Sequence, residues 1–170
     1  QTISWEHAEH MTEQERFIDN GDGTITDTRY NMMWLKQDSY QAKGKWCTWK
    51  GANKFTQKLN DEKFAGFDDW RLPKKTEARN LYEHESKNTD FNGDIVHIDL
   101  KFPEGCGFTY WCEEESGINA MAYNFYSDRA YLVRRKTKGE SFMSCRPVRS
   151  SGPEVKKFGR VSDTGRSRRE

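Results

Sequence analysis

Residues 16–37 read RFIDNGDGTITDTRYNMMWLKQ, with strand-forming residues on both sides of a polar turn. The turn holds Asn20-Gly21 and Asp22-Gly23, dipeptides that tolerate the positive φ angles of tight hairpin turns. This pattern predicts two antiparallel strands joined by a short loop. A β-hairpin is therefore the first structural expectation for the chain.

The same stretch resembles a calcium-binding loop of the EF-hand type at first sight. With Asp22 and Gly23 at the fifth and sixth loop positions, Ile18 would stand at the first position and Arg29 at the twelfth. An EF-hand needs an oxygen ligand at the first position and a bidentate carboxylate at the twelfth, so both ligands are missing. The hairpin is the preferred interpretation, and we predict no metal and no other cofactor.

Helical periodicity follows further along the chain. Thr48 is a suitable N-cap, and residues of one helical face then recur at spacings of three and four. The residues of that face are Trp49, Ala52, Phe55, Thr56 and Leu59. Residues 74–85 predict a second helix, with Ala78, Leu81 and Tyr82 directed inward.

The apolar stretches of the last third of the chain have the pattern of strands. They cover residues 108–114, 119–127, 130–136 and 140–149. A run of helices followed by a run of strands indicates the α+β class rather than an alternating βαβ order. We therefore expect two short helices packed on a mostly antiparallel sheet.

Composition divides the chain into three parts. The 170 residues suit one domain, and a 14% aromatic content compensates for a mean hydropathy of -1.08. We expect a polar arm at 1–15, a domain at 16–149 and a basic tail at 150–170. The arm has Glu6, Glu9, Glu13 and Glu15 but no Lys or Arg before Arg16. The tail is expected to contact a partner through Lys156, Lys157, Arg160, Arg166, Arg168 and Arg169.

Charge and hydropathy also bear on partners and location. The formal net charge is +1, so no overall field attracts nucleic acid. No apolar run approaches the ~20 residues needed to cross a bilayer, so membrane association is expected only through a partner. Gln1 is not a natural initiator, and removal of a secretory signal is the simplest explanation. We therefore expect an exported protein, periplasmic or extracellular.

The cysteine count agrees with export. An even number of cysteines in an exported domain suggests disulfides, whereas the alternative is buried thiols in a cytosolic protein. The four residues are Cys47, Cys106, Cys112 and Cys145. Three pairings are possible, and we prefer Cys106 with Cys112 and Cys47 with Cys145. The spacing of Cys106 and Cys112 does not fit a zinc or haem site.

Several motifs together resemble the Lcl C-terminal-domain family of exported bacterial proteins. They occur in the family's order over about residues 16–149: FIDNGDGTITDTRYNMMWLK, DWRLPKKTEARNLY, FP, YW, AYNFYSD and CRPVR. Lys74 replaces the family's usual small hydroxyl residue after WRLP, so the second helix should lose that cap. Cys112 replaces the usual serine after YW, which points to a local disulfide.

The resemblance implies a C-type lectin-like fold with a long loop region, about residues 88–117, that carries recognition. The calcium-site strings of sugar-binding C-type lectins, such as Glu-Pro-Asn and Trp-Asn-Asp, do not occur. There is also no nucleophile–histidine–acid order, phosphate loop or nucleotide fingerprint. We predict no catalytic residues.

Two features suggest a contact surface instead. Tyr110 and Trp111 precede the acidic run 113–115, and aromatic residues beside charges suit an interface. The basic run comprises Arg134, Arg135, Lys136 and Lys138. The first hypothesis is a non-enzymatic binding or assembly module, an accessory subunit of a larger complex. The second is an adhesin for sulfated or other anionic glycans, and the third is a cysteine- or metal-dependent oxidase of the lectin-like superfamily.

Overall fold

The predicted hairpin is confirmed in the computed structural model, which describes residues 15–152. Strand β1 (Phe17–Asp19) pairs antiparallel with β2 (Thr24–Asp27), so that Phe17 lies opposite Asp27. In the turn, the Asp22 carboxylate accepts hydrogen bonds from the backbone nitrogen and the hydroxyl of Thr24. Asp19 accepts from the Gly21 nitrogen and pairs with the Lys36 ammonium at 2.7 Å. The acidic side chains of this loop therefore stabilise a turn.

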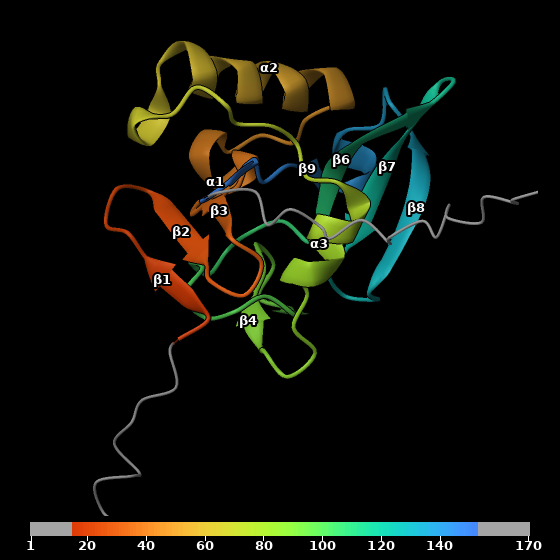
Figure 1. Ribbon diagram of the computed structural model, residues 1–170. Helices are drawn as coiled ribbons and strands as arrows, with labels where there is room; N and C mark the ends of the chain where they lie inside the picture. The colour runs from red at the N-terminus through yellow and green to blue at the C-terminus, as the bar shows by residue number, and fades with distance from the viewer. Residues whose placement is uncertain (1–14, 153–170) are drawn as a thin grey trace, which may run out of the picture.

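Two four-stranded sheets form the β part of an α+β fold (Figure 1). The first sheet contains, in pairing order, β1, β2, β3 (Met32–Leu35) and β10 (Val148–Ser150). The second contains β8 (Arg129–Arg134), β7 (Asn119–Asn124), β6 (Thr109–Ser116) and β9 (Met143–Ser144). All pairs are antiparallel except that of β9 with β6. The strands β4 (Asn88–Thr89) and β5 (Ile95–Val96) lie between β3 and β6 in the chain and form a separate two-stranded sheet.

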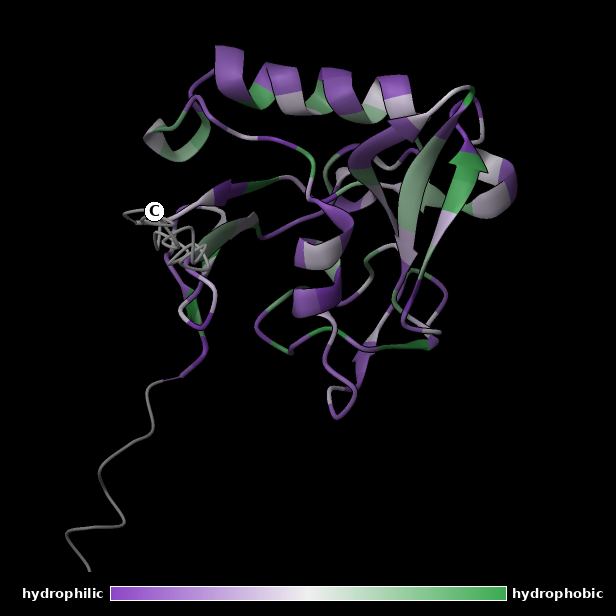
Figure 2. Ribbon diagram, turned by 45° about the vertical axis from the view of Figure 1, so that its right-hand side comes forward, coloured by the Kyte–Doolittle hydropathy of each residue, from purple (hydrophilic) through white to green (hydrophobic). Residues whose placement is uncertain are grey.

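Helix α2 (Trp49–Asp61) confirms the first predicted helix. The Thr48 hydroxyl accepts a hydrogen bond from the Gly51 nitrogen, as an N-cap does. Ala52, Thr56 and Leu59 are its buried residues. Hydrophilic and hydrophobic residues alternate along the helix in Figure 2, as expected of a helix with one face on the core.

Helix α3 (Lys75–Leu81) confirms the second predicted helix and ends earlier than expected. Lys74 makes no side-chain cap. Instead the Glu77 carboxylate accepts from the Lys74 nitrogen at 2.8 Å, and the Glu114 carboxylate of β6 accepts from the Lys75 nitrogen at 2.8 Å. Carboxylates at a helix N-terminus satisfy free N–H groups and complement the helix dipole, so the lost hydroxyl cap is replaced.

The core lies on both faces of the second sheet. Successive residues of β6 point to opposite faces. Tyr110 and Cys112 pack with Ala78 and Leu81 of α3, while Trp111 packs against Ala52 of α2. The prediction that Tyr110 and Trp111 form a contact surface is wrong, because they are only 1% and 0% exposed.

The long loop region is shorter than expected. Residues 88–108 contain only the two-residue strands β4 and β5, but Thr109 begins the eight-residue strand β6. The structure also adds helix α1 (Ser39–Lys43), which the sequence analysis did not predict. Among residues 15–152, no helix has the length and apolar character needed to cross a membrane.

Candidate functional site: an aromatic surface

Aromatic side chains from five separate segments meet at the surface beside the loop region. We call this group the aromatic patch, and its members are Tyr40, Trp46, Phe91, Phe108, Tyr126 and Phe142. All are partly exposed, Phe142 by 40%. Contiguous, partly exposed aromatic side chains are uncommon on a monomer and mark contact surfaces.

Phe91 lies at the centre of the patch. Its ring centroid is 4.8 Å from that of Trp46, 5.2 Å from Phe142 and 6.4 Å from Phe108. On one side Tyr40 stacks on Trp46 at 4.0 Å, and on the other Tyr126 stacks on Phe108 at 4.3 Å. The rings therefore form one continuous surface.

Hydrogen bonds hold the loop that carries Phe91. The Asp90 carboxylate accepts from the Asn92 and Asp94 nitrogens, both at 2.9 Å. Its second oxygen accepts from the Tyr126 hydroxyl. Asp90 is 3% exposed, so its carboxylate makes its hydrogen bonds within the protein rather than with solvent. A preorganised loop costs little conformational entropy when a partner binds.

A buried polar network supports the other side of the patch. Asp38 caps α1, which carries Tyr40, by accepting from the Gln41 nitrogen at 2.8 Å. Its other oxygen accepts from the Gly107 nitrogen at 2.6 Å and the Tyr110 hydroxyl at 2.8 Å. The Arg146 guanidinium donates to that hydroxyl at 2.9 Å. The network thus ties α1 to strand β6 and to the segment before β10.

Electrostatics in this network follow from burial. Arg146 is 0% exposed, whereas Arg149, at the other end of the CRPVR motif, is partly exposed. Burial raises the pKa of the Tyr110 hydroxyl well above its ordinary value, despite the nearby Arg146 charge. Tyr110 therefore stays protonated and can donate to Asp38. The side chains of Asp38, Tyr110 and Arg146 therefore satisfy one another by hydrogen bonds, and the network has a structural role.

The charged runs partly neutralise each other. Arg135 pairs with Glu115 at 2.9 Å and lies over the Trp49 ring at 5.6 Å. Arg134, Lys136 and Lys138 are exposed. The cations predicted in the tail, from Lys156 to Arg169, lie outside the described residues.

The four cysteines are free thiols, so neither expected disulfide is formed in the structure. Cys106 and Cys112 contact different groups, the carbonyl oxygens of Thr89 and Tyr110. Burial raises the pKa of the Cys106 thiol to about 11. Both thiols therefore behave as inert parts of the core.

Cys47 and Cys145, in contrast, lie together. The hydroxyl of Ser39 is 3.7 Å from the Cys47 sulfur and accepts from the Cys145 nitrogen at 2.9 Å. A hydrogen bond with the Cys145 thiol lowers the pKa of half-buried Cys47, whereas burial raises the pKa of Cys145. This pair is the more reactive one.

Metal ligands do not gather in the described part of the chain. Between residues 15 and 152 no group of three or more His, Cys, Asp or Glu side chains could hold an ion. His84 and His97 stack at 5.7 Å, and the His97 Nδ1 lies 3.0 Å from the Ser86 carbonyl oxygen.

Sequence reasoning missed every member of the aromatic patch. The sequence feature that these residues share is an aromatic side chain inside a polar stretch, such as Phe91 between Asp90 and Asn92. That feature does not show which of these aromatic residues will meet, because their contacts join distant segments, such as Trp46 and Phe142, which are 96 residues apart in the sequence.

A comparison with protein-family models gives a match over most of the chain. The family model described as the Lcl C-terminal domain matches residues 23–149. The search of curated proteins finds no match. The matched range contains all six residues of the aromatic patch, the Asp38–Tyr110–Arg146 network and all four cysteines.

Proposed function

The chain belongs to the Lcl C-terminal domain family, and from this premise we propose that it is a non-enzymatic binding module, an accessory or interaction subunit that contacts another protein. The observation that carries the proposal is the aromatic patch. Large rings held in place by a buried network supply contact area at a low entropic cost. We also propose that the domain is C-type lectin-like, with the loops around Phe91 at its recognition face.

The chemistry of the patch favours a protein as the ligand. Interface hot spots are enriched in Trp and Tyr, and the rings around them exclude water. Phe91, Phe108 and Phe142 have no polar atoms beyond the backbone, which suits an apolar side chain of a partner. The basic tail, outside the described residues, would add orientation more than affinity.

The test compares two patch variants with a surface control. Phe91→Ser and Phe142→Asn each remove a ring, and Asn suits the positive φ of 51° at position 142. Each is expected to weaken the native complex about 10–30-fold, as for an interface hot spot. The control is Leu132→Ser on β8, which is 49% exposed and lies outside the patch. The measurement is the Kd for the partner that co-purifies at native expression level. Equal affinity of all variants would reject the patch as the binding surface.

Anionic glycan binding is the second candidate, because Arg134, Lys136 and Lys138 are exposed close together. It predicts a different result in the same experiment. Binding to a sulfated glycan would be weakened by Lys136→Glu and by added salt, but not by Phe142→Asn.

The proposed export predicts that Cys47 and Cys145 are oxidised to a disulfide in the native compartment. The bond would close a loop of about 100 residues and stabilise the fold by about 4–5 kcal/mol in the chain-entropy model. Thiol titration in denaturant should then find two thiols, and four after reduction. Cys106→Ser should lower the first number to one, whereas Cys47→Ser should raise it to three.

The same titration addresses the oxidase alternative. Four thiols in the protein from its native compartment would contradict the proposed disulfide and leave Cys47 available for reaction. Two thiols would leave only the buried Cys106 and Cys112, which are unsuited to a cysteine-dependent oxidase.

A further inference from the structure

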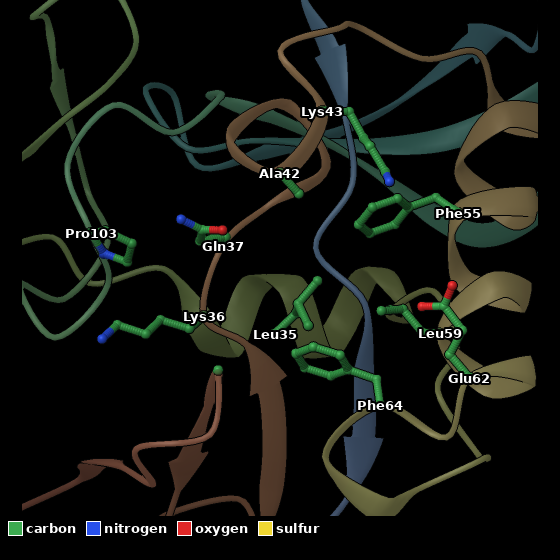
Figure 3. A pocket seen from close by; sticks show the side chains of 11 residues that line it. Leu35, Lys36, Gln37, Ala42, Lys43, Phe55, Leu59, Glu62, Phe64 and Pro103 are labelled. Atoms are coloured by element: carbon green, nitrogen blue, oxygen red, sulfur yellow. The ribbon is translucent and has the colours of Figure 1, made fainter.

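A second surface feature lies beside Ala42 and Lys43 of α1. It is a cavity of about 440 Å³ between α1, α2 and the turn of the β1–β2 hairpin (Figure 3). Leu35, Phe55, Leu59 and Phe64 form its apolar part. Lys36 and Lys43 also line it (Figure 3). A volume of this size accepts a large aromatic side chain.

Specific contacts of the fold hold the walls of the cavity in place. A Cβ at Gly23 would lie 2.8 Å from the Phe64 ring, so only glycine lets the hairpin turn approach this wall. Gln41 of α1 donates to the Pro103 and Glu104 carbonyl oxygens at 3.1 and 3.0 Å, which fixes the opposite wall. The walls therefore come from segments held by other contacts.

The charged side chains that line the cavity indicate which end of the chain fits it as an occupant. Lys36 is paired with Asp19, but Lys43 has no ion pair among the described residues. Glu62 also lines the cavity, and its carboxylate lies 3.7 Å from the Lys58 ammonium. An occupant should thus bring an apolar group and an acid for Lys43. The basic tail after residue 152 has the wrong charge for Lys43.

Residues 1–14 have the required chemistry. They read QTISWEHAEHMTEQ, with Trp5 followed at once by Glu6 and no Lys or Arg. The described chain starts next to them at Glu15, whose carboxylate pairs with the Lys101 ammonium at 3.0 Å. Lys101 is two residues before Pro103, which lines the cavity. Glu15, the first described residue, is therefore linked through Lys101 to the segment that forms one wall of the cavity.

The arm between Trp5 and Glu15 is long enough for Trp5 to reach the cavity. Ten residues separate Trp5 from Glu15, and an extended chain spans about 3.3 Å per residue, or roughly 33 Å. Pro103 lies at most about 8 Å from Lys101 along the backbone, and a lysine side chain adds a further ~6 Å. Tethering also gives a linked segment an effective concentration of about millimolar, so a weak contact is enough.

We propose that Trp5 of the N-terminal arm docks in this cavity of its own chain, with Glu6 or Glu9 facing Lys43. The occupant is an aromatic side chain next to a carboxylate. The contact is separate from the aromatic patch, because no residue of the patch lines the cavity. It closes an apolar surface that would otherwise be open to solvent.

The test uses the full chain labelled with 5-fluorotryptophan, which has six fluorine resonances from its six Trp residues. Trp5→Phe assigns the resonance of Trp5. We expect that resonance to differ from its position in the isolated peptide 1–14. Lys43→Glu should lower the docked fraction several-fold and move the resonance toward the peptide position. The matched control Lys50→Glu changes an exposed lysine of α2 outside the cavity and should leave it in place.

Three results would overturn the proposal. The first is a Trp5 resonance at the peptide position in the unmodified chain. The second is a shifted resonance that Lys43→Glu leaves unchanged but Phe142→Asn moves, which would place Trp5 on the aromatic patch. The third is a shift that disappears on dilution, which would mean docking in a second copy.

Discussion

Replacing Arg146 with Met should lower the free energy of unfolding by about 3–5 kcal/mol, the usual cost of breaking a buried charged network. Arg146 is 0% exposed and donates to the carbonyl oxygens of Leu35 and Lys36 as well as to the Tyr110 hydroxyl. The variant leaves both carbonyls without this donor. It also leaves the buried Asp38 carboxylate without a nearby cation.

The measurement is equilibrium unfolding in urea, with the melting temperature as a second readout. A loss of this size should lower Tm by about 10 °C or more. Arg135→Met is the control, because Arg135 is 39% exposed in its ion pair with Glu115. An exposed pair contributes about 0–1 kcal/mol. The double variant Asp38→Asn/Arg146→Met should lose less than the sum of the single losses, because the two groups share one network. Equal stability of Arg146→Met and Arg135→Met would contradict this account.

Gly107→Ala should destabilise the domain by about 2–4 kcal/mol, through overpacking and a strained hydrogen bond. A Cβ at position 107 would lie 2.3 Å from the Ser144 hydroxyl oxygen and 3.4 Å from the Trp46 ring. The Ser144 hydroxyl is itself buried and donates to the Thr109 carbonyl oxygen at 3.0 Å. The backbone must therefore shift, and with it the Gly107 nitrogen that donates to Asp38.

Two further variants separate this contact from a general effect of losing glycine. Gly105→Ala faces open space and differs only in its positive φ of 89°, so it should cost about 1 kcal/mol. Adding Ser144→Gly to Gly107→Ala should recover part of the loss, since it removes the atom that a new Cβ meets. Urea unfolding measures all of them. No recovery in the double variant would show that the close approach to Ser144 is not the cause.

Local signals explain which elements were predicted. The hairpin depends on glycines within the turn, and α2 depends on the Thr48 cap and on residues three and four apart. Both signals lie inside the element that they determine. Helix α1 was missed because it has five residues and depends on Asp38 and on contacts of Gln41 with residues 103–104. Those contacts cannot be seen in a short sequence window.

The disulfide and interface predictions depended on contacts between residues far apart in the sequence, and the structure does not confirm them. Cys106 and Cys112 are close in sequence, but their sulfurs contact different carbonyl groups. Cys47 and Cys145 are far apart in sequence, and the fold brings them together beside Ser39. Tyr110 and Trp111 alternate across β6, and both are buried because helices cover both faces of that sheet.

The family, the α+β class, the hairpin and helices α2 and α3 followed from the amino-acid sequence, because turn residues, caps and periodicity act between neighbours. The tertiary structure decided which aromatic residues are core and which reach the surface. It buried Tyr110 and Trp111, gathered Phe91, Phe108 and Phe142 into one patch, and placed Arg146 beside Asp38. Exposure and proximity of this kind depend on contacts between residues far apart in the chain, which only packing of the whole domain determines.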